Sequence, residues 1–184
     1  MKIKINGNQI SLVQLICLIV YYGFCTYLPN SSFPIFGKPS RKLRYLCCKR
    51  IFKSCGNNVN IERKASFGNG LNVEIGNNSG IGRYSHIPPN IKIGNDVMMA
   101  PEVFIFHMNH NFDSINVPMR SQGIKDSAPV IIEDDVWIGR NVMILPGKTI
   151  KKGSIIAAGC VLTKNFSEYS IVGGNPSILI KIRN

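Results

Sequence analysis

The sequence predicts an all-β fold, a parallel β-helix of about five coils, preceded by a helical segment and interrupted by one long loop. The main observation is an apolar residue at every sixth position in two runs, a period that suits neither an α-helix nor an ordinary strand. A second observation is the glycine that often follows this residue, where the chain turns a tight corner. Stacked coils would place on their common axis Ile75, Ile81, Ile87, Ile93, Met99, Ile105, Ile132, Ile138, Ile144, Ile150, Ile156 and Leu162.

Residues 1–54 are predicted to form an N-terminal apolar and basic helical segment. Its strongly apolar centre, Ile10 to Leu28, is nineteen residues long, close to the roughly 20 residues that span a bilayer. A helix packed on the β-helix or between subunits fits best, and a helix on a membrane surface comes next. A membrane-spanning helix fits less well, because Ser11, Gln14 and Gly23 interrupt the run. A signal peptide fits least, since no small-residue cleavage site follows cleanly.

The net charge of +12 is concentrated near the N-terminus. No acidic residue precedes Glu62, whereas nine lysines and arginines lie within residues 1–53. This distribution argues against nucleic acid as a partner, and it favours association of residues 1–53 with an anionic membrane surface. The six cysteines lack the CxxC spacing of a zinc site, and reduced thiols in a cytoplasmic protein explain them best. The expected location is therefore the cytoplasm, with the inner face of the membrane as an option.

Residues 55–184 are predicted to form the β-helix. Ile61 and Phe67 extend the repeat upstream, with a slip of two residues before Ile75. The interval between Ile105 and Ile132 is not a multiple of six, so a loop over 106–129 must leave the coil and return. Residues 165–184 are expected to form a C-terminal tail. One inward position, two residues before Ile150, holds Lys148, which predicts either a local bulge or an amine that reaches the surface.

Histidines single out the loop as the candidate catalytic segment. Only His86, His107 and His110 occur in the chain. His86 lies at a predicted corner, where a structural role is favoured. His107 and His110 open the loop, and histidine is the natural proton acceptor near neutral pH because its unperturbed pKa is about 6.5. Loops on rigid scaffolds often carry function.

The chain resembles the hexapeptide-repeat O-acetyltransferases, the group of maltose and galactoside acetyltransferases. The resemblance covers about residue 57 to the C-terminus, and within the family it is closer in style to enzymes of capsule, exopolysaccharide and O-antigen synthesis. It implies a left-handed coil, an exception to the usual right-handed crossover. The motifs that carry it are His110-Asn111-Phe112-Asp113, Pro129-Val130-Ile131-Ile132-Glu133-Asp134-Asp135-Val136-Trp137-Ile138-Gly139, Ile144-Leu145-Pro146-Gly147 and Val172-Gly173-Gly174-Asn175-Pro176.

The resemblance implies roles for individual residues. His110 matches the catalytic base, which would take the proton of an acceptor hydroxyl as it attacks the acetyl thioester directly, without a covalent intermediate. The backbone N–H of Arg140 matches the oxyanion donor. Trp137 would wall the site, or else fill a gap between subunits. Candidates for acceptor binding are Asp113, His107 and Glu133; Asp113 could instead pin the loop.

For acetyl-CoA, the resemblance implies a groove between neighbouring coils. Gly139 and Ala158 match positions along the pantetheine, while Thr163, Lys164 and Lys181 match positions near the nucleotide end. Lys164 could also be an ordinary surface charge. A further position that is often basic in the family holds Ile178 here, and Arg183 is the residue that could compensate. No metal is implied.

The family also implies a homotrimer with active sites between subunits and a sugar or glycan acceptor, with surface polysaccharide synthesis as the setting. Two alternatives stay open. A zinc hydratase like the γ-type carbonic anhydrases shares the coil, although its histidines are spaced more widely than His107 and His110. A non-catalytic β-helix scaffold is the other.

Overall fold

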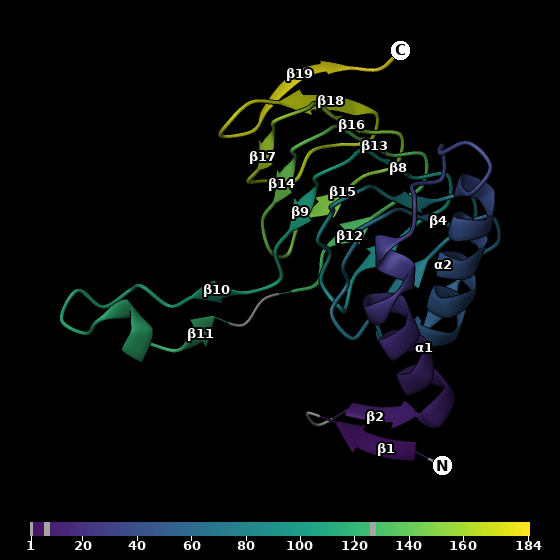
Figure 1. The fold of residues 1–184 in the computed structure, drawn as a ribbon. Helices are drawn as coiled ribbons and strands as arrows, with labels where there is room; N and C mark the ends of the chain where they lie inside the picture. The colour runs from purple at the N-terminus through teal and green to yellow at the C-terminus, as the bar shows by residue number, and fades with distance from the viewer. Residues whose placement is uncertain (1, 6–7, 126–127) are drawn as a thin grey trace.

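The protein is a β-helix flanked on one side by two helices, with a two-stranded arm projecting from it (Figure 1). The computed structural model describes residues 2–5, 8–125 and 128–184. Each coil contributes short strands to three parallel stacks, as the six-residue repeat predicts. The coil is stable because every turn buries the same few inward side chains against the turns beside it.

The strands stack in order along the axis. The first stack runs through β3 (Ser54–Cys55), β5 (Glu74–Ile75), β7 (Lys92–Ile93), β12 (Ile131–Ile132) and β15 (Thr149–Ile150). The second begins with β4 (Asn60–Ile61) and β6 (Gly80–Ile81) and continues through β8 (Met98–Met99), β13 (Trp137–Ile138), β16 (Ile155–Ile156) and β18 (Ser170–Gly173). The last strand, β19 (Ile178–Ile182), pairs antiparallel with β18. The third contains β9 (Phe104–Ile105), β14 (Met143–Ile144) and β17 (Val161–Leu162). Five turns are complete, and β18 opens a sixth.

The predicted axial ladder is confirmed. In the first stack Ile75 pairs in register with Ile93, Ile93 with Ile132, and Ile132 with Ile150. All twelve predicted axial residues have exposed fractions of 9% or less. The second inward position also behaves as expected, since small Ser79 and Ser85 are buried and their hydroxyls accept hydrogen bonds from the amides of Val97 and Val103 on the next coil. These two hydroxyls are thus satisfied without loss of packing, whereas the buried hydroxyl of Ser154, at the same inward position, has no hydrogen-bond partner among the described residues.

Lys148 is half-buried, whereas the other residues at its inward position are buried. Its carbonyl still accepts a hydrogen bond from the amide of Ile131 at 3.0 Å, so the strand register continues past it. The side chain borders a cavity under the arm that Asn109 and Lys125 also line. Of the two predictions for Lys148, a local bulge or an amine that reaches the surface, the geometry supports the second.

Asn and Asp residues at the corner between the first and second stacks link successive coils. Asn58, Asn78 and Asp96 have positive φ angles of 57°, 57° and 56°, a conformation that Asn and Asp tolerate better than most residues. Their side chains bond from coil to coil, with Asn58 donating to Asn78 and Asn78 donating to Asp96 at 3.0 and 2.9 Å. The corner residues therefore form a second ladder on the outside of the coil.

The N-terminal region is more structured than the sequence predicted. The antiparallel strands β1 (Lys2–Ile5) and β2 (Asn8–Ser11) precede α1 (Leu12–Gly23), which is followed by the short 3-10 helix η1 (Cys25–Tyr27) and by α2 (Gly37–Ile51). Ser11 caps α1 through a reciprocal capping box with Gln14. The strand pair was not predicted, although alternating Ile3 and Ile5 followed by an Asn-Gly dipeptide is a sequence signal for a hairpin.

Helix α1 packs on α2 and on the first coil, as the best-fitting interpretation of the apolar run predicted. The hydroxyls of Tyr21 and Tyr22 each donate to a backbone carbonyl of the coil, at Ala65 and Gly68, both at 2.8 Å. The rings of both tyrosines pack against Phe67. Within the described residues, no helix has the length and apolar character needed to cross a bilayer.

Arg44, one of the nine lysines and arginines counted in residues 1–53, is not on the surface. Its side chain is fully buried between α2 and the first coil, where its guanidinium lies 3.7 Å from the carboxylate of Glu62 and donates to the carbonyls of Ile61 and Pro29. Burial is the main influence on the pKa of Arg44 and lowers it, while Glu62 acts in the opposite direction. The basic surface is therefore smaller than the sequence count implied.

Candidate active site

The predicted loop is an ordered arm. After β9 the chain forms β10 (Asn109–His110), a 3-10 turn η2 (Met119–Ser121) and β11 (Ile124–Lys125), and β10 and β11 pair antiparallel with His110 opposite Ile124. Figure 1 shows this arm extending away from the coil, on the side opposite the two helices in that view. The arm thus carries His110 away from the body of its own chain.

One side chain, Gln122, holds the outer part of the arm together. Its amide nitrogen donates to the carbonyls of Ser114 and Val117 at 2.8 and 2.7 Å, and its amide oxygen accepts from the backbone of Ser114 at 3.1 Å. Asn111 adds two bonds across the arm, to Gly123 and Gln122. Sequence reasoning missed Gln122, because a single polar residue in a loop carries no periodic signal.

His110 itself is exposed, and its backbone amide is bonded to the side chain of the preceding Asn109 at 3.1 Å. Among the described residues of this chain no hydrogen bond to its imidazole is present. Asp113, three residues later, is exposed as well. A single chain therefore presents the predicted base without the wall that a reaction site requires.

His107 and His86 share a cavity at the base of the arm. This cavity, about 340 Å³ in volume, is also lined by Ser66, Phe104 and Met108. The Nδ1 of His86 lies 2.7 Å from the Ser66 hydroxyl, and its ring stacks on Phe104 with centroids 4.9 Å apart. These contacts account for the predicted corner role of His86, and they also make its ring a fixed wall beside His107.

The segment Trp137-Ile138-Gly139-Arg140 lies where two coils approach closely. The amide of Gly139 donates to Ile156 at 2.8 Å, and the amide of Gly159 donates to the carbonyl of Arg140, also at 2.8 Å. A Cβ atom on Gly139 would lie 2.5 Å from the backbone nitrogen of Ala158, which explains why only glycine fits. Half-exposed Trp137 sits beside this contact on β13.

Two amides at this corner remain available for a ligand. Within the described residues, neither the N–H of Arg140 nor that of Ala158 donates to a protein acceptor, although the amides on either side of each are bonded. Arg140 and Ala158 are exposed, and unpaired backbone amides are ready hydrogen-bond donors. The Arg140 side chain points elsewhere, with one nitrogen 3.9 Å from Glu102 in an exposed pair that contributes little.

The residues predicted for the nucleotide end lie near the C-terminal end of the coil. Both the amide and the hydroxyl of Thr163 lie 3.0 Å from the hydroxyl of buried Ser177, which ties the tail to the last coil. Lys181 is exposed on β19, opposite Ile171. Sequence reasoning overlooked Ser177, although it directly follows the Asn-Pro motif.

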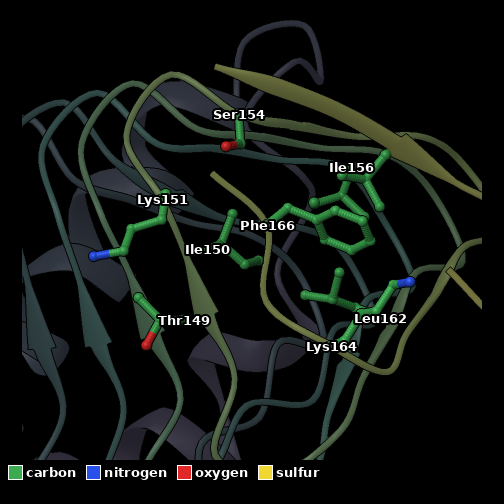
Figure 2. Close-up of a pocket in the computed structure, with 9 residues that line it drawn as sticks. Thr149, Ile150, Lys151, Ser154, Ile156, Leu162, Lys164 and Phe166 are labelled. Carbon is green, nitrogen blue, oxygen red and sulfur yellow. The ribbon is translucent and has the colours of Figure 1, made fainter. Parts of the chain in front are cut away.

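Phe166 closes the end of the core, and Lys164 lies outside it. Figure 2 shows the Phe166 ring among Ile150, Ile156 and Leu162, while the amines of Lys151 and Lys164 point outward in opposite directions. The space left there is about 10 Å³, room for about one water molecule. The Lys164 amine lies 5.5 Å from the centroid of the Phe166 ring, so it is a surface charge at the edge of a filled core.

Glu133 is engaged in a separate network. Its carboxylate accepts from the Lys151 amine at 2.8 Å and from the Lys152 amide at 2.9 Å. The hydrogen bond from Lys151 is the main reason that the pKa of Glu133 is lowered. It borders a different cavity from the one that holds His107. One chain thus brings Gly139 and Ala158 together, and it does not bring Glu133 into the cavity of His107.

Comparison with known proteins identifies the family. The family model for bacterial transferase hexapeptide repeats matches residues 72–107 and 129–164. A putative lipopolysaccharide biosynthesis O-acetyl transferase of Escherichia coli, WbbJ, is 30% identical over 163 residues, which cover 82% of this chain and 83% of that protein. The chain belongs to the hexapeptide-repeat O-acetyltransferases. It spans about two thirds of the length of some curated relatives and less than half of others.

Solved structures of this acetyltransferase family agree over nearly the whole chain. A maltose O-acetyltransferase from Clostridium difficile superposes with a TM-score of 0.72 at 30% identity, covering 95% of this chain and 90% of the other. A galactoside acetyltransferase in complex with coenzyme A gives 0.65 at 27% identity, covering 94% and 81%. The predicted donor, acetyl-CoA, is confirmed as that of the family. Within the described residues of this acetyltransferase, no group of three His, Cys, Asp or Glu side chains could hold a metal ion.

Proposed function

We propose that this acetyltransferase moves the acetyl group of acetyl-CoA to a hydroxyl of a sugar within a surface glycan. The observation that carries the proposal is that one chain presents both an exposed histidine on a projecting arm and, at the Gly139 corner of the coil, two amides without a protein acceptor. Acetyl transfer needs a base for the acceptor proton and donors for the developing oxyanion. His110 and the Arg140 N–H supply these two chemistries.

In the proposed mechanism the His110 imidazole takes the proton of the acceptor hydroxyl while the hydroxyl oxygen attacks the thioester carbon. The negative charge that develops on the carbonyl oxygen is stabilised by the Arg140 N–H, and the CoA thiolate then leaves. The Ala158 N–H would bond the pantetheine arm in the same groove. Because both substrates meet in one oriented complex, no acyl-enzyme intermediate is needed.

The site is proposed to form between subunits of a homotrimer. In a single chain the arm exposes a row of apolar side chains that would need cover: Phe106, Met108, Phe112, Ile115, Val117, Met119 and Ile124. A neighbouring copy supplies such cover if the arm lies against its coil. His110 would then face the groove and Trp137 of a neighbour, with His107 and Asp113 at the acceptor, and with Thr163, Lys164 and Lys181 at the nucleotide end of acetyl-CoA.

The acceptor class is proposed from the relatives. WbbJ is described as an enzyme of lipopolysaccharide biosynthesis and is matched over most of its length. Six free cysteines support a reducing compartment, so the cytoplasm is the proposed location. A lipid-linked glycan would be held at the inner face of the membrane, and residues 1–53 would bring the enzyme there.

The experiment is an acetyl-transfer assay with purified protein. Acetyl-CoA is incubated with maltose, a galactoside or a lipid-linked oligosaccharide, and both free CoA thiol and the acetyl ester are measured, the ester by mass spectrometry. Ester formation that requires one acceptor class supports the proposal. Release of CoA at the same rate with and without every acceptor, and with no ester formed, would contradict it.

A further inference from the structure

Helix α1 turns an apolar face outward. Leu12–Gly23 contains no charged residue, and the side opposite the coil carries Val13, Ile16 and Ile19, each at least 50% exposed. Just beyond the helix, Phe24 and Tyr27 are both 57% exposed, and the Lys64 amine lies 3.4 Å from the centroid of the Tyr27 ring. We call these five residues the α1 stripe. A contiguous apolar surface of this kind on a soluble protein marks a contact with another apolar body.

A second exposed apolar group lies between the two helices. Phe33, Ile35 and Phe36 are 50%, 86% and 59% exposed, and Ile35 adopts a positive φ of 64°. A β-branched residue in this conformation is strained, and here the strain accompanies a side chain held out into solvent. No contact within the described residues of this chain accounts for the backbone strain at Ile35.

Helix α2, which packs on α1, adds positive charge to this helical layer. Lys38, Arg41 and Lys42 lie on one side of α2 and line a cavity of about 320 Å³ together with Tyr45 and Asn58. Arg41 is held in place by Asn58, whose carbonyl and side-chain oxygens accept from it at 3.0 and 2.6 Å. Among the described residues no acidic group pairs with any of the three cations, whereas Arg44 and Lys53 are each paired with a glutamate.

We propose that the α1 stripe and the basic side of α2 dock on an anionic lipid bilayer, with α1 lying in the interface and a headgroup phosphate in the Lys38–Arg41–Lys42 cavity. This inference rests on the proposed function, and it names the residues that would carry the membrane association proposed there. Amphipathic surfaces bind membranes through apolar burial together with attraction to anionic lipids.

The charge decides between a bilayer and a second copy of the chain. Self-association through α1 would bring two basic α2 surfaces together, and like charges brought close repel each other. An anionic bilayer reverses the sign of that interaction. Figure 1 shows both helices on the side of the coil away from the arm in that view, so docking there leaves the arm clear of the membrane.

The test is flotation of the full-length protein with vesicles of phosphatidylglycerol and phosphatidylcholine in equal parts. Wild type should float with these vesicles, and less with phosphatidylcholine alone or in high salt. The double variant Ile16→Ser, Ile19→Ser should lower the partition coefficient by at least about tenfold. Lys38→Gln and Lys42→Gln should each lower it about fivefold. Circular dichroism checks that each variant is folded.

Matched controls lie on the coil. Ile178→Ser removes an equally exposed apolar residue on β19, and Lys92→Gln removes an exposed lysine on β7; both should float like wild type. A loss caused by Ile178→Ser but not by the α1 variants would overturn the proposal. So would a change of oligomeric mass in the α1 variants, by light scattering, without a change in flotation, since the stripe would then be a subunit contact.

Failure of this inference is distinguishable from failure of the proposed enzyme. Transfer to a water-soluble acceptor, measured on the same preparations, should be equal in wild type and the α1 variants. Wild type that transfers acetyl groups but never floats would reject the membrane surface and keep the enzyme. Wild type that floats but transfers to no acceptor would reject the proposed enzyme and keep the membrane surface.

Discussion

Replacement of Gly139 by alanine tests the close approach of coils at the proposed CoA-binding corner. The new methyl group would lie 2.5 Å from the Ala158 nitrogen, 2.9 Å from its Cα and 3.0 Å from the Ala157 carbonyl carbon. All three atoms are backbone, so relief requires the coils to separate and stretches the 2.8 Å bond from Gly139 to Ile156. Overpacking of this kind costs about 1–3 kcal/mol.

The assays are urea unfolding and calorimetric titration with CoA. Gly139→Ala should lower the free energy of unfolding by about 1–3 kcal/mol, and CoA affinity should fall further because the Ala158 amide moves. Gly80→Ala is the matched control: it lies on the same stack, and its new methyl group would meet only Asn60, at 3.4 Å. A Gly139→Ala protein with the stability and CoA affinity of the control would refute the reasoning.

Three further predictions concern side chains that join separate segments of the chain. Gln122→Ala should speed hydrogen exchange of the amides of residues 109–125 and reduce acetyl transfer, with the coil amides unchanged; unchanged exchange in the arm would show that Gln122 does not hold it. Ser177→Ala should lower CoA affinity by severalfold and raise exchange in β18 and β19 without lowering the transfer rate at saturating CoA, since Thr163 loses its two contacts; a titration identical to wild type would contradict this. Burial by itself would raise the pKa of Glu62, but hydrogen bonds from Ser31 and Asn60 outweigh it and the pKa is lowered below 4.5. Its stabilisation is therefore present above about pH 4.5 and lost as the pH falls through the folded value, so Glu62→Gln should flatten the acid limb of stability, and an acid limb as steep as that of wild type would count against it.

The coil could be predicted from the sequence because each axial position repeats the same physical requirement. Twelve apolar residues at one spacing admit few folds, and the break between Ile105 and Ile132 marks the arm. Arg44 shows the limit of this reasoning. In the sequence Arg44 cannot be told from a surface cation. Only the packing of α2 on the coil shows that its side chain is buried beside Glu62. Charge counted along a sequence therefore overestimates a basic surface.

The candidate site could be proposed from the sequence residue by residue, but not in its arrangement. Motifs singled out His110, Gly139 and Ala158 as candidates, and the structure places the last two close together. The sequence could not reveal that Glu133 is held by Lys151 and Lys152, because that contact joins neighbouring coils. Nor could it reveal the α1 stripe, because the sequence of an apolar helix does not show which side faces the coil.

Acetyl transfer by a His110→Ala variant tests the central claim most directly. His110 is exposed on the arm, and its imidazole makes no hydrogen bond to the described residues, so oligomeric mass and CoA affinity should match wild type. The rate of transfer to the preferred glycan acceptor should fall by a factor of about 10² to 10⁴, the usual contribution of a general base. Turnover equal to wild type, with folding and CoA binding intact, would contradict the account.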